Sequence, residues 1–187
     1  MQITLASASP RRQALLKQIC ANFSVVPANI DEKRGKAESP EHLVKRLALE
    51  KAKAVFARHS TGIVLGSDTL IAKDNEVLGK PRDCADFLSM MKVLSESKHL
   101  VLTAVAGVAH GQEDCELVAT EVTFAKVSTA DAQAYWQTGE PQDKAGGYAI
   151  QGLAEQFISH ISGSYSAVVG LPLYQTKQLL ERFHSWT

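Results

Sequence analysis

The chain alternates short apolar runs with amphipathic stretches, and this pattern predicts strands interleaved with helices. Nearly continuous apolar runs, or runs that alternate polar and apolar positions, indicate strands, whereas apolar residues three and four apart indicate helices. The strands predicted in this way are residues 2–6, 23–27, 62–72, 76–78, 100–109 and 117–124. The predicted helices are residues 10–20, 40–59, 82–97 and 129–138, with a last helix that opens at Pro172.

The first predicted helix begins with an unusual pair of cations. Ser9 is a good N-cap, and Pro10 suits the first helical position, so Arg11 and Arg12 lie in the first turn. A helix N-terminus already carries partial positive charge, and acidic residues are the usual choice there. Two guanidinium groups beside free N–H groups favour an anion site, with a phosphate chain as its guest. The alternative is a pair of solvated arginines on an amphipathic helix.

The second helix carries a lysine on its apolar face. Val44, Ala48, Lys51 and Val55 follow one another at helical spacing. A lysine in such a stripe either extends its ammonium to the surface or points it into a functional cleft.

The strand of residues 62–72 contains one charge, Asp68, among apolar neighbours. A lone carboxylate is costly there unless it is paired, hydrogen-bonded or bound to a metal, so we favour a functional role. Lys80 follows the short strand 76–78 and precedes Pro81, which stops a central strand. A hairpin would bring Lys80 close to Asp68, although an exposed turn lysine is the simpler reading of Lys80 alone.

Two polar loops add further candidates. Asp31 and Glu32 lie in a polar stretch, where they face either a metal ion or water, and water is the better reading of the loop alone. The glycine-rich segment 140–152 contains Gln151, whose amide both donates and accepts, as the edge of a nucleobase requires. An ordinary long connection is the alternative for this segment.

Composition narrows the choice of partners. The 187 residues suffice for one compact domain or two small lobes, and we expect a single domain over 1–187. The net charge is zero, which argues against a nucleic-acid module or a membrane-binding surface. No apolar run is long enough to span a bilayer, and no secretory signal is recognised. Cys20, Cys84 and Cys115 are widely spaced, which favours free thiols in a reducing cytoplasm over a zinc site.

Taken together, the ordered motifs resemble the Maf family of nucleoside triphosphate pyrophosphatases. The resemblance spans nearly the whole chain and departs from the family pattern at Ala8, Gly147 and Ala149. The matching segments are Ser7–Arg12, Glu50–Ala52, Gly66–Thr69, Gly79–Pro81, Asp143–Gly146, Ile150–Gly152 and Gly163–Pro172. It implies an α/β fold of the inosine-triphosphatase-like type, also called the Maf/Ham1 fold, with a mixed sheet flanked by helices and two lobes around a cleft.

The resemblance also implies a reaction and a substrate class. Members of this family hydrolyse a nucleoside triphosphate to the monophosphate and pyrophosphate with a divalent cation, Mg²⁺ or Mn²⁺. The branch similar to dTTP/UTP pyrophosphatases carries Arg, Thr and Gln at the positions of Arg12, Thr69 and Gln151. A neutral uracil or thymine offers carbonyl acceptors and one N–H donor, which a hydroxyl and an amide match. The chain therefore resembles the pyrimidine branch, whose role would be house-cleaning of nucleotide pools.

We assign roles to the candidates as hypotheses. Arg11, Arg12, Lys51 and Lys80 bind the triphosphate, with Ser7 adding a hydrogen bond. The resemblance implies that Arg12 bears on base choice, either instead of or in addition to binding phosphate. Asp68 accepts a proton from the attacking water, binds the metal ion, or does both. Glu32 is a further candidate ligand for the metal ion or for the water, and the resemblance is the main reason for naming it. The competing function is a non-catalytic nucleotide-binding regulator of cell division, and a homodimer remains open.

Overall fold

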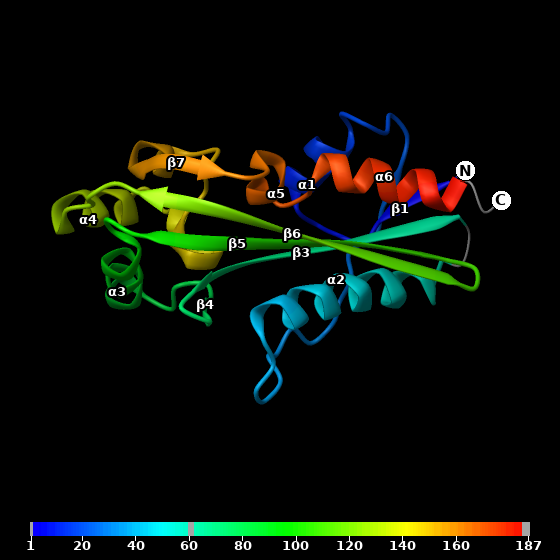
Figure 1. Cartoon of the computed structure of the whole chain (residues 1–187), viewed down its shortest axis with the longest axis horizontal. Coiled ribbons are helices and arrows are strands. Elements are labelled where there is room, and N and C mark those ends of the chain that lie inside the picture. Colours follow the sequence, from blue (N-terminus) through cyan, green and yellow to red (C-terminus); the bar gives the residue numbers. More distant parts are fainter. Residues whose placement is uncertain (1, 60–61, 185–187) are drawn as a thin grey trace.

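A computed structural model describes residues 2–59 and 62–184, and its framework is one seven-stranded mixed sheet (Figure 1). The strand order is β2-β1-β3-β5-β6-β7, and β4 pairs with β3 outside this path. β1 is parallel to both neighbours, and every other pairing is antiparallel. The strands are β1 (Ile3–Leu5), β2 (Ser24–Val25), β3 (Ile63–Lys73), β4 (Glu76–Leu78), β5 (Lys98–Ala109), β6 (Gln112–Phe124) and β7 (Ile158–Ser162).

Helices cover both faces of this sheet. In Figure 1, α2 lies under β3, whereas α1, α5 and α6 lie over the opposite face, and α3 and α4 stand at the far end. The α-helices are α1 (Pro10–Leu16), α2 (Pro40–Phe56), α3 (Cys84–Leu94), α4 (Thr129–Gln137), α5 (Tyr165–Val169) and α6 (Leu173–His184). Short 3₁₀ helices η1 (Glu140–Asp143), η2 (Ala145–Gly147) and η3 (Leu153–Phe157) fill the loop before β7. None of the helices in the described ranges is long and apolar enough to cross a membrane.

The predicted α/β class is confirmed, with several differences in detail. α1 ends at Leu16 rather than at residue 20, because residues 17–19 continue only as turns. β6 already begins at Gln112, where a loop was expected, because β5 and β6 stay in register from Ala109↔Gln112 onward. β7 and α5 were not predicted, since the first is short and largely polar and the second spans five residues. The single domain expected over 1–187 stays a prediction, and its terminal residues 1 and 185–187 lie outside the described ranges.

The long strands link separate hydrophobic cores. One core joins β1, α1 and α6 through residues such as Leu5, Leu16 and Leu179. Another lies between α2 and the sheet, and a third joins α3, α4 and the loop before β7 around Phe87 and Phe124. β3 and β5 contribute residues to the first and the third of these cores, so the two strands connect the two ends of the sheet. The cavity described below opens between these cores, near the middle of β3, where Asp68 and Thr69 line it.

His99 is a buried imidazole at the far end of the sheet. It is 3% exposed and forms a 2.7 Å hydrogen bond between Nε2 and the Tyr148 hydroxyl. Its Nδ1 has no partner among the described residues. Desolvation, and secondarily the Lys73 charge, lower the pKa of His99 from 6.5 to about 4. The folded protein thus holds this imidazole neutral at pH values where the unfolded chain begins to protonate it.

The lowered pKa of His99 predicts acid lability. Its contribution to the free energy of unfolding is fully present above pH 6.5 and is lost as the pH falls from 6.5 towards 4, because the unfolded state then binds more protons. Between pH 7.5 and pH 5 we expect a loss of about 2 kcal/mol from this group. Urea denaturation of His99→Gln should show a weaker pH dependence, whereas the exposed His59→Gln should match the parent protein. An unchanged slope in His99→Gln would contradict the assignment.

Candidate active site

The candidate site lies at a gap in one edge of β3. On this edge β1 pairs with β3 as far as Leu65, and β4 pairs with it only from Ile71 onward. Residues 66–70 therefore have a strand neighbour, β5, on one side alone within the described part of the chain. Asp68 and Thr69 lie in this gap, and successive strand residues project to opposite faces of a sheet. The gap therefore has two walls, one on the face of the sheet towards which Asp68 projects and one on the face towards which Thr69 projects.

The wall on the α2 face is built around Lys51. Its Nζ lies 2.6 Å from Asp68 Oδ1 and 2.7 Å from Glu32 Oε1. Lys51 and Asp68 are each 7% exposed, whereas the Glu32 side chain is 58% exposed. Of the two alternatives that the helical stripe left open for Lys51, the structure shows the inward one, because the side chain is buried and lines the cavity described below. Burial of either charge alone would be costly, so the pair depends on both partners.

The loop that carries Glu32 is fastened to α2 by Arg46. The Arg46 guanidinium donates to Glu38 Oε1 at 2.7 Å and to the Lys33 carbonyl at 3.0 Å. The Arg46 hydrogen bond, which is the largest contribution, lowers the pKa of Glu38 to about 2. Glu32 thus stands on a loop that is held against the helix rather than on a free connection.

The opposite wall is organised by Arg12. Its Nε donates to the Gly170 carbonyl at 2.9 Å, and its terminal nitrogens donate to Thr69 Oγ1 at 3.3 Å and Ser7 Oγ at 3.4 Å. Burial lowers the pKa of the Arg12 guanidinium, and the charges of Asp68 and Glu32 oppose that effect. Arg12 therefore joins α1, β3 and the end of α5. Its hydrogen bonds lie on the Thr69 side of the gap, opposite the Lys51–Asp68 pair.

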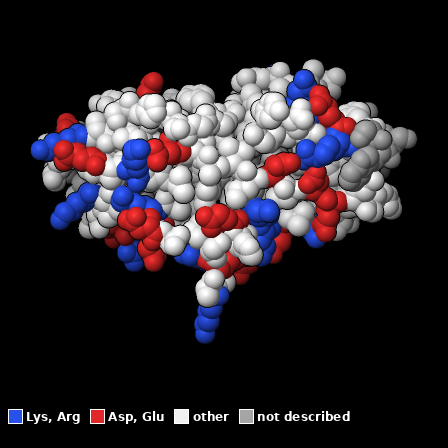
Figure 2. Space-filling model, in the orientation of Figure 1, with Lys and Arg blue, Asp and Glu red and all other residues white. Residues whose placement is uncertain are grey.

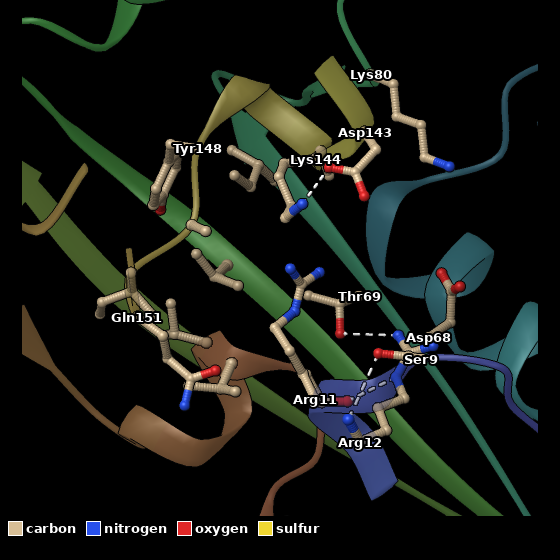
Figure 3. A pocket seen from close by; sticks show the side chains of 18 of the residues that line it. Ser9, Arg11, Arg12, Asp68, Thr69, Lys80, Asp143, Lys144, Tyr148 and Gln151 are labelled. Carbon is tan, nitrogen blue, oxygen red and sulfur yellow. Dashed lines mark hydrogen bonds and ion pairs between the residues drawn. The ribbon is translucent and has the colours of Figure 1, made fainter. Parts of the chain in front are cut away.

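Both walls belong to one cavity of about 260 Å³ (Figure 3). Gln151 and Tyr148 lie at one side of this view, and Asp68 and Lys80 lie at the other. The cations that line the cavity are Arg11, Arg12, Lys51, Lys80 and Lys144. The carboxylates that line it are Glu32, Asp68 and Asp143. This excess of positive charge in an otherwise neutral protein suits a polyanionic ligand.

The structure brings together most of the residues selected from the sequence. Asp68, Lys51, Lys80, Arg11, Arg12, Thr69, Gln151 and Glu32 all line the same cavity. Ser7 is different, because it is buried behind Arg12, where its hydroxyl accepts from Arg12 and from the Ser9 N–H, and Ser9 lines the cavity in its place. The individual roles of these residues in binding and catalysis stay predictions.

Sequence reasoning assigned no role to Lys144 or Asp143, although both lie in a motif of the resemblance. Lys144 lines the cavity with a mostly buried side chain and forms an ion pair with Asp143. The Lys144 hydrogen bond is the main cause that lowers the pKa of Asp143, and Arg11 contributes through its charge. The pair was missed because it lies in a polar segment without periodicity, where only the Asp-Lys dipeptide marks it.

Two acidic side chains, Asp68 and Glu32, could bind a divalent cation on the α2 wall. Asp68 and Glu32 both contact the Lys51 ammonium, so their oxygens lie close together. No group of three or more His, Cys, Asp or Glu side chains in the described ranges could hold a metal ion. Oxygen donors from one or two carboxylates, completed by substrate phosphates and water, are nevertheless the usual ligands of Mg²⁺ in nucleotide enzymes. The donor set therefore fits such an ion shared with a ligand.

These features define an α/β protein with a cation-rich cavity around a buried carboxylate. The Maf-like protein family matches residues 2–183, and the chain belongs to that family. A relative from Vibrio cholerae named dTTP/UTP pyrophosphatase is 50% identical, covering 97% of this chain and 98% of its own. One from Pseudoalteromonas atlantica with the same name is 48% identical over 96% of both chains. Among solved structures, the Staphylococcus aureus Ham1 protein gives a TM-score of 0.49 at 11% identity, covering 67% of this chain and 72% of its own.

Gly66 lets α2 approach β3 closely enough to form the Lys51–Asp68 pair, so Gly66→Ala tests this packing. A Cβ at position 66 would lie 2.1 Å from the Ala48 carbonyl oxygen and 2.8 Å from the Ala52 nitrogen. Because these are backbone atoms, the helix itself must move, and overpacking of this kind costs about 1–3 kcal/mol. We expect Gly66→Ala to lower the urea concentration at which half of the protein is unfolded, by the amount that this loss of stability implies.

Gly35→Ala is the matched control, since its Cβ would meet only ordinary contacts with Glu38. It should unfold at nearly the same urea concentration as the parent protein. A Gly66→Ala variant as stable as the control would show that α2 does not depend on this close approach.

Proposed function

We propose that this chain hydrolyses dTTP and UTP to the nucleoside monophosphate and pyrophosphate. The observation that carries the proposal is the buried Lys51–Asp68 pair, which opens into a cavity where cations outnumber carboxylates. A binder of polyanions gains nothing from a buried acid that repels its ligand, whereas a hydrolase needs a group to accept a proton. Membership of the Maf family and the names of its close relatives support the same reaction.

The two walls of the gap suggest how a nucleotide is oriented. Lys51, Lys80 and Arg11 supply charge for the phosphates, with Lys144 as a further cation. The Thr69 face is lined by apolar side chains and the Gln151 amide, which suit a flat heterocycle with polar edges. The apolar residues on that side include Ile71, Val101, Tyr148, Ile150, Val168 and Val169. The base is thus placed by Thr69 and Gln151, and the α–β anhydride reaches Asp68.

Asp68 is the proposed proton acceptor. A water molecule attacks one phosphorus atom of the α–β anhydride, its proton passes to the Asp68 carboxylate, and the bridging P–O bond breaks. Lys51 fixes the carboxylate by its 2.6 Å contact and neutralises charge that develops on the phosphates. Arg11 adds positive charge from α1 and Lys80 adds it from the loop after β4, so charge neutralisation comes from three separate segments.

We also propose that a divalent cation, Mg²⁺ or Mn²⁺, takes part. Asp68 and Glu32 would hold it, and it would neutralise phosphate charge when bound. Glu32 is suited to this role because it is exposed and can move from the Lys51 ammonium to an ion.

The remaining expectations concern partners and location. Acidic and basic side chains are interspersed on the face shown in Figure 2, without a broad basic band, which supports a free nucleotide over nucleic acid as the ligand. The three cysteines are free, which supports the cytoplasm as the compartment. The homodimer stays a prediction, and a mass measurement in solution would test it.

Product analysis tests the proposed reaction. With dTTP or UTP and Mg²⁺ or Mn²⁺, phosphate should be released only when an inorganic pyrophosphatase is added, because the primary product is pyrophosphate. Direct release of phosphate would indicate γ-cleavage instead. No release from any member of a panel that includes CTP, modified uridine triphosphates and 7-methyl-GTP would favour the non-catalytic regulator.

Substitution of the carboxylate tests the proton acceptor. Asp68→Asn keeps the shape of the side chain but cannot take up the proton, so kcat should fall by about 100- to 10,000-fold. Cooperative thermal unfolding should persist, since Lys51 retains Glu32. Asp74→Asn, in the turn after the same strand, is the matched control and should retain full activity. An Asp68→Asn variant that keeps most of its activity would contradict the assignment.

Removal of metal tests the cation. EDTA should abolish pyrophosphate release, and added Mg²⁺ or Mn²⁺ should restore it. Glu32→Gln should raise the metal concentration required for half-maximal activity, because one charged ligand is lost. Full activity in EDTA would contradict a role for a divalent cation.

A further inference from the structure

A line of hydroxyl groups runs behind the Thr69 wall and ends at a carbonyl oxygen of α5. Thr103, on β5, lies opposite Thr69 in the register, and its Oγ1 is 3.0 Å from Thr69 Oγ1. The same Thr103 Oγ1 lies 2.7 Å from the Ala167 carbonyl oxygen. Thr103 is 0% exposed and does not line the cavity, so it meets a ligand only through Thr69.

Each hydroxyl in this line has one hydrogen-bond acceptor for its single proton. A hydroxyl has one proton, and a carbonyl oxygen can only accept. Ala167 lies in the last turn of α5, where helical carbonyls lack partners within the helix. Thr103 must therefore donate to Ala167, because two oxygens 2.7 Å apart without a proton between them would repel each other. Thr103 then accepts from Thr69, which donates its own proton inward.

This arrangement leaves Thr69 without a proton for the cavity. Its oxygen also accepts from the Arg12 guanidinium at 3.3 Å, which again presents only a donor to it. One lone pair of Thr69 Oγ1 remains, and it can meet only a donor on the ligand. Uracil and thymine carry an N–H at ring position 3, whereas cytosine has a bare acceptor nitrogen there.

We propose that Thr103 is a positioning residue for base selection, which orients the Thr69 hydroxyl as an acceptor and thereby favours uracil and thymine over cytosine. The proposal rests on the proposed nucleotide hydrolysis and deepens it. It assigns selectivity to a residue that touches no ligand, through the Thr69–Thr103–Ala167 line.

Thr103→Val tests this orientation, because valine has nearly the same shape but no hydroxyl. Thr69 would then be free to turn its proton towards the cavity and to donate to cytosine. The measurement is kcat/KM for UTP and for CTP, two nucleotides that share the ribose and the triphosphate. We expect the UTP-to-CTP ratio to fall by about tenfold, the size of effect typical of one hydrogen bond. Thr103→Ser keeps the hydroxyl and should restore most of the ratio.

Thr120→Val is the matched control. Thr120 is also 0% exposed, lies on β6, and contacts Ser164 beside α5, but it has no link to Thr69. Its loss should change kcat/KM for both nucleotides by the same factor. If Thr103→Val does not fold, as judged by thermal unfolding, Thr103→Ala makes the same comparison.

Two outcomes would overturn the proposal. One is a Thr103→Val or Thr103→Ala enzyme in which UTP and CTP lose activity by equal factors, which is the mark of a purely structural role. The other is a Thr103→Ser enzyme that is as unselective as the valine variant. A parent protein that hydrolyses neither nucleotide would instead refute the proposed function, so the two failures are distinguishable.

Discussion

The contact between Lys51 and Asp68 is the interaction on which the site depends. Both groups are almost fully buried, and buried ion pairs often contribute little net stability because desolvation offsets their attraction. Hydrophobic residues would fill the same space at lower cost, so stability alone does not account for the pair. The position of the pair accounts for it instead, since the pair lies where β3 has no strand neighbour on one edge and where the cavity opens. The close packing of α2 at Gly66 holds the pair in place.

The gap between β1 and β4 divides the chemistry of the site. Asp68 and Thr69 are adjacent in sequence, yet they face opposite sides of the sheet, where one meets a lysine from α2 and the other an arginine from α1. The α2 wall thus carries the charges of Lys51, Asp68 and Glu32, while the other combines the Arg12 guanidinium with hydroxyls, an amide and apolar side chains. A nucleotide has the same division, with a charged tail and a flat polar-edged ring. In the proposed binding mode, a short stretch of one strand orients both parts.

Several elements of this site could be read from the sequence because single residues contradicted their surroundings. Asp68 interrupts an apolar strand, Lys51 interrupts an apolar stripe, and Arg11 and Arg12 stand where acids are usual. Lys144 and the Thr103–Ala167 contact could not be found in this way. Lys144 has no periodic context, and only the lining of the cavity shows where it lies. Threonine is ordinary in a strand, so only the pairing of β3 with β5 and the docking of α5 show that Thr103 contacts Thr69 and Ala167. Short elements such as β7 and α5 escape for the same reason, since tertiary packing rather than local pattern forms them.

The central claim is that a nucleotide lies across the gap, with its phosphates on the α2 wall. A crystal structure of the Asp68→Asn variant with UTP and Mg²⁺ tests it most directly. Phosphate oxygens should lie within hydrogen-bond distance of Lys51 Nζ, and the uracil ring should lie against Thr69 and Gln151. A triphosphate bound elsewhere, with Lys51 still closed on Glu32 and residue 68, would contradict the account.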